Sequence, residues 1–156
     1  MEKSVFGVMG ITIEIKKEYR MSGNIHKVWG ERRRILLTDT IELDLLYLKP
    51  NTFCSTHSHT DKINLFTVIK GKVRIETEFG KITLKKNESF QVDAPLKHRF
   101  VALAKSIMIE VAFVSTGKID ADDIKREVQG GKIIKNKEYS IPELKKAGYL
   151  ELENTE

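Results

Sequence analysis

The stretch that decides the fold is NTFCSTHSHTDKINLFTVIKG, which runs from Asn51 to Gly71. It places His57 and His59 two residues apart, and an apolar, β-branched segment over 65–69 follows them. Because side chains alternate between the two faces of a strand, histidines at this spacing project to the same side. Two neutral imidazoles on one face offer two ligands to one metal ion, although an isolated pair also occurs as ordinary surface or core histidines.

Outward from this stretch, the sequence predicts β-structure almost throughout residues 34–114. Apolar and polar residues alternate over 41–45, 73–76 and 82–85, and the segment 107–114 is more continuously apolar. Turn signals separate these segments at 49–51, 70–72, 79–81, 86–88 and 94–95. Many short strands at such intervals are typical of an antiparallel sandwich or barrel.

The composition is that of a soluble domain. Of 156 residues, 40% are hydrophobic and 31% charged, which suits one domain with a packed core. No apolar run approaches the roughly 20 residues of a membrane helix, and charged residues interrupt the first 20 positions, unlike a secretion signal. The single cysteine, Cys54, excludes an internal disulfide. We therefore expect a cytoplasmic protein with no membrane partner.

The net charge of +5 raises the question of nucleic-acid binding. The lysines are spread along the chain among acidic residues, and only Arg32 to Arg34 form a tight cluster. No nucleic-acid-binding motif accompanies them, so we expect no nucleic-acid partner. A net positive field favours small anionic molecules instead.

Two segments resemble the sequence motifs of the cupin family. Residues 51–71 match the spacing of the first motif, in which two histidines one residue apart are followed by a glutamate and a glycine. Residues 87–100, NESFQVDAPLKHRF, resemble the second motif and place His98 at its histidine. The resemblance implies an all-β fold, an antiparallel cupin β-barrel or jelly roll. It also implies one divalent metal ion on His57, His59 and His98, and leaves open zinc, manganese, nickel or iron.

The sequence departs from these motifs at three asparagines. Asn51 and Asn87 stand where the family has glycine, and asparagine is the other residue that readily adopts a positive φ, so both turns can form. Asn64 occupies the position of the glutamate ligand. Its neutral amide oxygen would be a weak fourth ligand, leaving coordination positions open to water or an anion. The alternative interpretation is that the pocket no longer binds metal.

Parity along the strands suggests which residues line a pocket. Phe66 and Val68 share a face with Asn64, and Phe100 shares one with His98, so these apolar residues either line a small-ligand pocket or form barrel core. Glu110 interrupts an apolar run and, if its face is interior, is a buried carboxyl able to act as acid or base.

The same parity places other residues away from the site. Cys54, three residues before His57, is expected on the opposite face. Most of the other charged residues nearby, namely Lys62, Arg74, Lys97 and Arg99, are expected to face solvent.

A narrower resemblance concerns function. The segments HKVWG (26–30), IEV (109–111) and DIKR (123–126) are similar to the layout of the C-terminal cupin domain of type II mannose-6-phosphate isomerases, although Ser55 replaces a glutamine of that group. This implies a sugar phosphate or nucleotide sugar as ligand and an isomerase or epimerase reaction, with Glu110 as the base. A three-histidine Fe(II) dioxygenase and a non-catalytic small-molecule-binding cupin are the alternatives.

The organisation predicted from these patterns has three parts. Residues 1–26 form an N-terminal strand or arm, 27–115 the barrel, and 116–156 a helical appendage. Within the appendage, 120–127 is predicted as a short helix, and Ser140 with Pro142 as the start of another that ends at Ala147 and Gly148. Because cupins commonly pair through sheet edges, a homodimer is expected.

Overall fold

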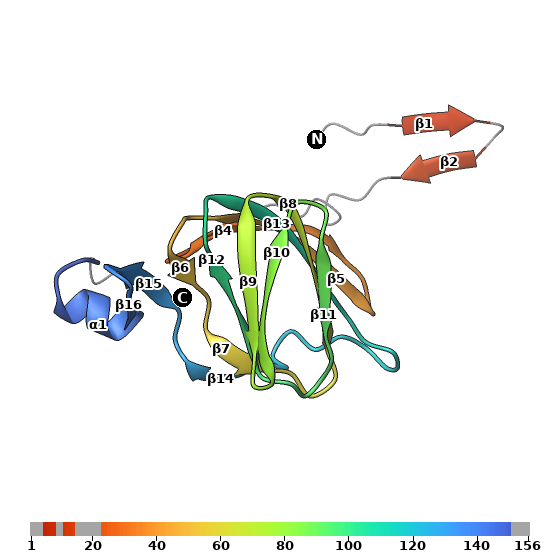
Figure 1. The fold of residues 1–156 in the computed structure, drawn as a ribbon. Helices are drawn as coiled ribbons and strands as arrows, with labels where there is room; N and C mark the ends of the chain where they lie inside the picture. Colours follow the sequence, from red (N-terminus) through yellow and green to blue (C-terminus); the bar gives the residue numbers. More distant parts are fainter. Residues whose placement is uncertain (1–4, 9–10, 15–22, 151–156) are drawn as a thin grey trace.

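The computed structural model describes residues 5–8, 11–14 and 23–150, and this part of the chain consists of antiparallel strands and one short helix (Figure 1). Near the N-terminus, β1 (Val5–Val8) pairs with β2 (Ile11–Glu14) in a hairpin. None of the helical residues described forms a segment long and apolar enough to cross a membrane.

Two antiparallel sheets face each other and enclose the core (Figure 1). The first sheet has six strands, in the order β11 (Ser89–Val92), β8 (Ile63–Lys70), β13 (Ser106–Phe113), β5 (Ile41–Leu48), β4 (Gly30–Leu37) and β3 (Asn24–Lys27). The second follows the order β10 (Gly80–Lys85), β9 (Lys72–Thr77), β12 (His98–Ala102), β6 (Thr52–Phe53), β15 (Gly131–Ile134) and β16 (Lys137–Ser140). Alongside these, β7 (Thr56–Ser58) pairs with both β12 and β14 (Lys125–Val128). The predicted all-β cupin jelly roll is confirmed.

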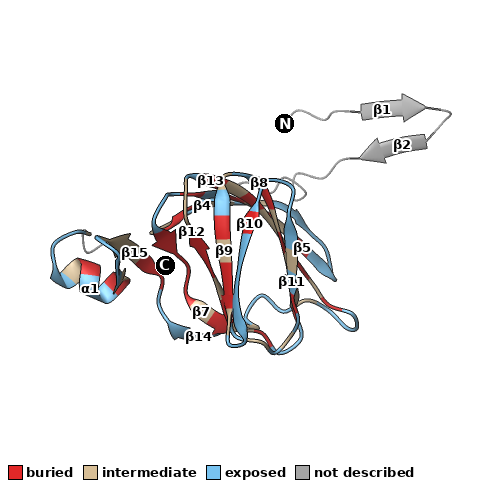
Figure 2. Cartoon of the chain, viewed as in Figure 1, coloured by how far each residue is buried: buried red, intermediate tan, exposed pale blue. Residues whose placement is uncertain are grey.

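The core lies between the two sheets, and strands of both sheets carry buried residues (Figure 2). Along β5 and β8 buried residues alternate with more exposed ones. Leu46, Val68 and Met108 of the six-stranded sheet meet Val73 and Ile75 of the other, and all five are almost fully buried. Burying each of these side chains contributes about 1.5–3 kcal/mol, which makes this packing the main stabilisation of the fold.

The two asparagines at glycine positions adopt the predicted conformation. Asn51 has φ of 58° and Asn87 has φ of 68°, both in the left-handed region. Asparagine tolerates this region because its short polar side chain hydrogen-bonds locally, so both turns form without glycine.

The C-terminal third differs from the prediction. Residues 120–127 are not a helix: a turn is followed by β14, which pairs with β7 at the edge of the second sheet. An open strand edge offers a row of backbone hydrogen bonds, and this outweighs the weak helical preference of a short polar segment. The second prediction is confirmed, since α1 (Ile141–Lys146) has Ser140 as its N-cap and Ala147 as its C-cap.

Candidate metal centre

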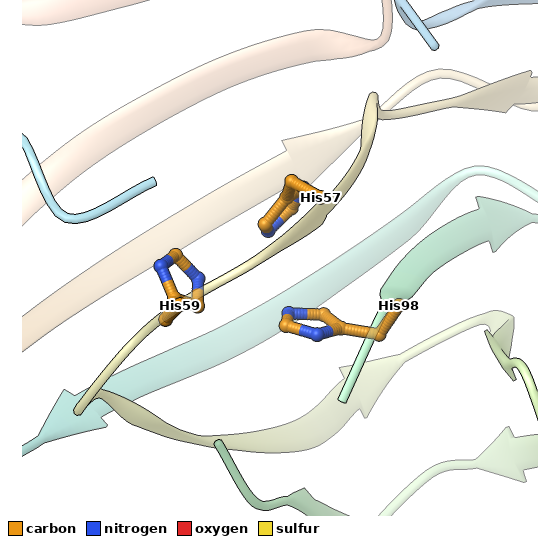
Figure 3. Close-up of side chains that lie close together, drawn as sticks. All are labelled: His57, His59 and His98. Atoms are coloured by element: carbon orange, nitrogen blue, oxygen red, sulfur yellow. The ribbon is translucent and has the colours of Figure 1, made fainter. Parts of the chain in front are cut away.

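Three histidines from two neighbouring strands converge on one point (Figure 3). His57 lies in β7, His59 follows directly after that strand, and His98 begins β12, where it pairs with His57 across the ladder. One ring nitrogen from each lies within 4.8 Å of those from the other two. The structure therefore brings together the three histidines that the sequence singled out, in an arrangement able to bind one metal ion.

Backbone carbonyl groups orient all three rings. His57 Nδ1 lies 2.8 Å from the Ser55 carbonyl oxygen, His59 Nδ1 lies 2.5 Å from that of Asp123, and His98 Nδ1 lies 2.9 Å from that of Leu96. Because a carbonyl only accepts, each Nδ1 carries the proton and each Nε2 keeps its lone pair. His59 Nε2 and His98 Nε2 are buried and have no hydrogen-bond partner in the part of the chain that the structure describes. Unpaired buried acceptors of this kind fit a metal ion.

Burial keeps these imidazoles neutral. Desolvation is the main cause, and it lowers the pKa of His57 to about 3 and that of His98 to about 4. It also lowers the pKa of His59. Since the neutral ring is the form that binds metal, protons do not compete for the site at neutral pH.

Asn64 lies beside the histidines and is only 1% exposed. Its Nδ2 donates a hydrogen bond of 2.7 Å to Glu110 Oε1, and its Oδ1 has no partner within the described residues. Because a carboxylate only accepts hydrogen bonds, Glu110 fixes the Asn64 amide with the amide nitrogen toward the carboxylate and the amide oxygen unpaired. The three imidazole nitrogens suit a divalent ion, and the pocket holds this amide oxygen as a neutral acceptor.

Glu110 points into the same pocket, as expected if its face of β13 is interior. Burial raises the pKa of this carboxyl to about 7, and the neighbouring charge of Asp44 adds to the effect, while the hydrogen bond from Asn64 opposes it. A carboxyl that is partly protonated near neutral pH can both accept and donate a proton.

A cluster of charged residues on β4 and β5, not singled out from the sequence, shares this pocket. Arg34 Nε donates to Asp44 Oδ1 at 2.5 Å, and Arg34 Nη1 lies 3.7 Å from Glu42 Oε1. Glu42 and Asp44 are the inward residues of the alternating segment 41–48, in phase with buried Leu46 and Leu48. The opposite face of this strand, with Ile41, Leu43, Leu45 and Tyr47, is at least as apolar, so the sequence alone does not show which face is interior.

The cavity has a volume of about 270 Å³. Phe66 and Phe100 are part of its wall, whereas Val68 is not: it lies deeper, in the core. Cys54 contradicts its predicted orientation, since it lines this pocket with His57. The irregular residues between β6 and β7 break the strict alternation on which the parity argument depended.

Lys62 also contradicts its predicted exposure, because it is only 5% exposed and lines the pocket. The other charged residues do point away from the histidines. Arg99 contacts Glu76 and Glu138, and Lys97 pairs with Glu127.

The fold and the histidine cluster define a cupin with a three-histidine site able to bind metal. Residues 14–129 match the family model described as "Mannose-6-phosphate isomerase C-terminal", and the chain belongs to this family. No curated protein matches the chain.

Solved structures share the fold at low sequence identity. KdgF from Halomonas sp. is 20% identical with a TM-score of 0.52, over 55% of this chain and 79% of that one. An oxalate decarboxylase of Bacillus subtilis is 16% identical with a TM-score of 0.58, over 67% of this chain but only 30% of the decarboxylase. An RmlC-like cupin from Shewanella frigidimarina is 15% identical with a TM-score of 0.51, over 55% and 76% of the two chains.

Proposed function

We propose that this cupin is a metal-dependent isomerase or epimerase of a small anionic sugar, with an aldose–ketose conversion of a sugar phosphate as the reaction. The observation that carries this proposal is the hydrogen bond between Asn64 and Glu110, which holds a buried carboxyl beside the three histidines. Membership of the mannose-6-phosphate isomerase C-terminal family supports the substrate class.

The size of the cavity favours a sugar phosphate over a nucleotide sugar. The cavity volume of about 270 Å³ is just below the volumes typical of small-molecule sites, which span about 300–1,000 Å³. A nucleotide sugar has more than twice as many atoms as a hexose phosphate, so a hexose phosphate is the better match.

The reaction needs a base and a means of stabilising negative charge. A divalent ion bound by the histidines would polarise the sugar carbonyl. Glu110 takes the proton from C2 of the aldose, the C–H electron pair becomes the C1–C2 double bond, and the π pair of the C1 carbonyl moves to the C1 oxygen, which gives an enediolate. Glu110 then returns the proton to C1, while the proton of the C2 hydroxyl moves to the C1 oxygen. Phe66 and Phe100 shield this step from water.

The test is Glu110→Gln, which keeps a side chain of the same shape in contact with Asn64. We expect kcat for interconversion of mannose 6-phosphate and fructose 6-phosphate to fall by about 10²- to 10⁴-fold, the range for loss of a general base. Sugar-phosphate binding, measured by calorimetry, should change only slightly. Glu78→Gln, at an exposed position in the turn after β9, is the matched control. Wild-type protein that neither binds nor converts these sugars with zinc, manganese, nickel or iron would refute the proposal.

A three-histidine donor set without a carboxylate ligand also favours a second candidate, an Fe(II) dioxygenase. Oxygen consumption by the iron-loaded protein separates the two candidates, because the isomerase reaction consumes no oxidant. Ligand binding without turnover and without oxygen uptake would leave the non-catalytic binding protein.

A further inference from the structure

The lysine that lines the metal pocket has no partner. Lys62 is 5% exposed, and its ammonium group makes no hydrogen bond or salt bridge to any residue in the described part of the chain. The ammonium is not sealed off from solvent: it reaches the open space of the pocket, where no side chain of the described residues supplies a counter-charge. An anion from outside the protein would supply the missing partner.

Strand register shows where this lysine lies along the depth of the pocket. Two rows of cross-strand neighbours line this side of the pocket. The row nearer the start of β8 contains Asn64, Ala112 and Glu42. The next row contains Phe66, Glu110 and Asp44. Lys62 immediately precedes β8. It is two residues before Asn64, so by strand alternation its side chain is expected on the same face. Glu42, Asp44 and Glu110 therefore all stand in rows of the sheet further from the start of β8 than Lys62 does.

A second cation stands at the same end. Arg126 lies on β14 directly opposite His57, is exposed, and lines the same pocket. Its side chain makes no hydrogen bond or salt bridge within the described residues. Both cations are close enough to act electrostatically on the metal site: Lys62 on His59 and Arg126 on His57.

We propose that Lys62 and Arg126 form an anion subsite at the mouth of the metal pocket, which binds the phosphate group of the substrate and thereby fixes its direction of entry. A lysine and an arginine together match the charge of a phosphate dianion. The sugar then extends inward, where Glu42, Asp44 and Glu110 offer acceptors for hydroxyl groups. The identity of the sugar rests on the proposed function, whereas the preference for an anion at the mouth does not.

The test compares the zinc-loaded wild-type protein with Lys62→Met and Arg126→Met, which keep much of each side chain and remove its charge. Calorimetry with fructose 6-phosphate, inorganic phosphate, fructose and glucuronate as probes gives the affinities. We expect each variant to bind fructose 6-phosphate and inorganic phosphate at least tenfold more weakly, with fructose affinity and zinc affinity unchanged. Lys86→Met, in the exposed turn between β10 and β11, is the control and should bind like the wild type.

Thermal unfolding provides a readout that does not depend on a ligand. If Lys62 is retained for binding and not for stability, Lys62→Met removes a charge without a partner in the described residues and should not lower the melting temperature of the ligand-free protein. A lower melting temperature, or unchanged phosphate affinity in Lys62→Met, would overturn the subsite. A preference for glucuronate over phosphate would assign it to a carboxylate instead. Phosphate binding that depends on Lys62 without sugar conversion would retain the subsite and reject the isomerase.

Discussion

At the scale of single residues, the metal centre is prepared by hydrogen bonds to the backbone. Three carbonyl groups fix the tautomers of His57, His59 and His98, and Glu110 fixes the orientation of the Asn64 amide. Such supporting contacts typically change metal affinity by about 10- to 100-fold when removed. Each ligand atom is thus held in a position where a metal ion is its natural partner.

Removal of two of these ligands should abolish metal binding. With His57→Ala and His98→Ala combined, only one imidazole remains, and we expect no zinc in protein purified without chelator. Metal analysis by mass spectrometry measures this, and circular dichroism shows whether the β-fold persists. His26→Ala, an exposed histidine outside the site, is the control and should retain full zinc occupancy. Zinc at equal occupancy in the double variant would place the metal elsewhere.

The neutral amide at position 64 should limit the strength of the site. Asn64→Glu adds a charged ligand. We expect the zinc affinity to rise by tens of fold, which is the size of effect that groups supporting a metal site typically have on metal affinity. Glu110 would then hold its proton and donate it in a hydrogen bond to the new carboxylate, so sugar turnover should fall. Competition with a chromophoric chelator measures the affinity. Unchanged or weaker zinc binding would show that the side chain at position 64 does not reach the metal.

At the scale of elements, the C-terminal strands complete the site instead of forming a separate helical layer. β14 pairs with β7 beside the histidines, and the Asp123 carboxylate accepts hydrogen bonds from the backbone N–H groups of Thr60 at 2.7 Å and Asp61 at 3.1 Å. β16 is attached through Arg99, which bonds to Glu76 and Glu138 and lies over the Phe53 ring at 4.9 Å.

This attachment predicts a pH dependence of stability. Burial opposes ionisation of Glu76, but hydrogen bonds and charge from Arg99, with Arg74 and Lys81, hold its pKa below the usual 4.5. A depressed folded-state pKa contributes stability that is present above pH 4.5 and is lost as the pH falls through the folded-state pKa. Glu76→Gln should therefore lower the free energy of unfolding by about 1–3 kcal/mol at neutral pH. In urea titrations the difference in the free energy of unfolding between wild type and Glu76→Gln should shrink below pH 4.5. A difference that stays constant with pH would contradict the link between Glu76 ionisation and stability.

The outer face of the six-stranded sheet predicts self-association. Leu43, Val111 and Leu65 stand level on three adjacent strands, with Leu45 and Ile109 in the next row, and all are only partly buried. A contiguous apolar face of this kind marks an interaction surface, and a second copy of the chain presents the same face.

We expect sedimentation to show a homodimer at tens of micromolar that Ile109→Glu converts to a monomer. Ile82→Glu, on exposed β10 of the other sheet, should leave the dimer intact. A monomeric wild-type protein, or a dimer that Ile82→Glu disrupts instead, would contradict this assignment.

At the scale of the whole molecule, metal binding and folding should be coupled, because the three histidines come from β7, the residue after it and β12, which meet only in the folded protein. Zinc at about 100 times its Kd should stabilise the fold by about 2.7 kcal/mol, provided that it binds only the folded state. Differential scanning fluorimetry should show a higher melting temperature with zinc, reversed by chelator. The double histidine variant should show neither change; an equal shift there would indicate binding outside the site.

Local pattern was sufficient to predict the strands between residues 34 and 114, the two asparagine turns, the start of α1 and the histidine pair. These features depend on periodicities of two residues and on the backbone preferences of asparagine, serine and proline, which act over a few neighbouring residues. His98 and Asn64 were placed by the resemblance to cupin motifs, since parity alone does not bring strands forty residues apart into contact.

Only the tertiary structure decided which charges lie inside. The alternation over 41–45 predicts a strand but does not say whether Glu42 and Asp44 or the intervening leucines face the interior; the six-stranded sheet buries the acids. Lys62 is buried because the loop before β8 closes against the metal pocket, and 125–128 is a strand because β7 leaves an open edge for it. Burial and edge pairing depend on which surfaces meet after folding. The order of apolar and polar residues along the chain therefore predicts them only in part.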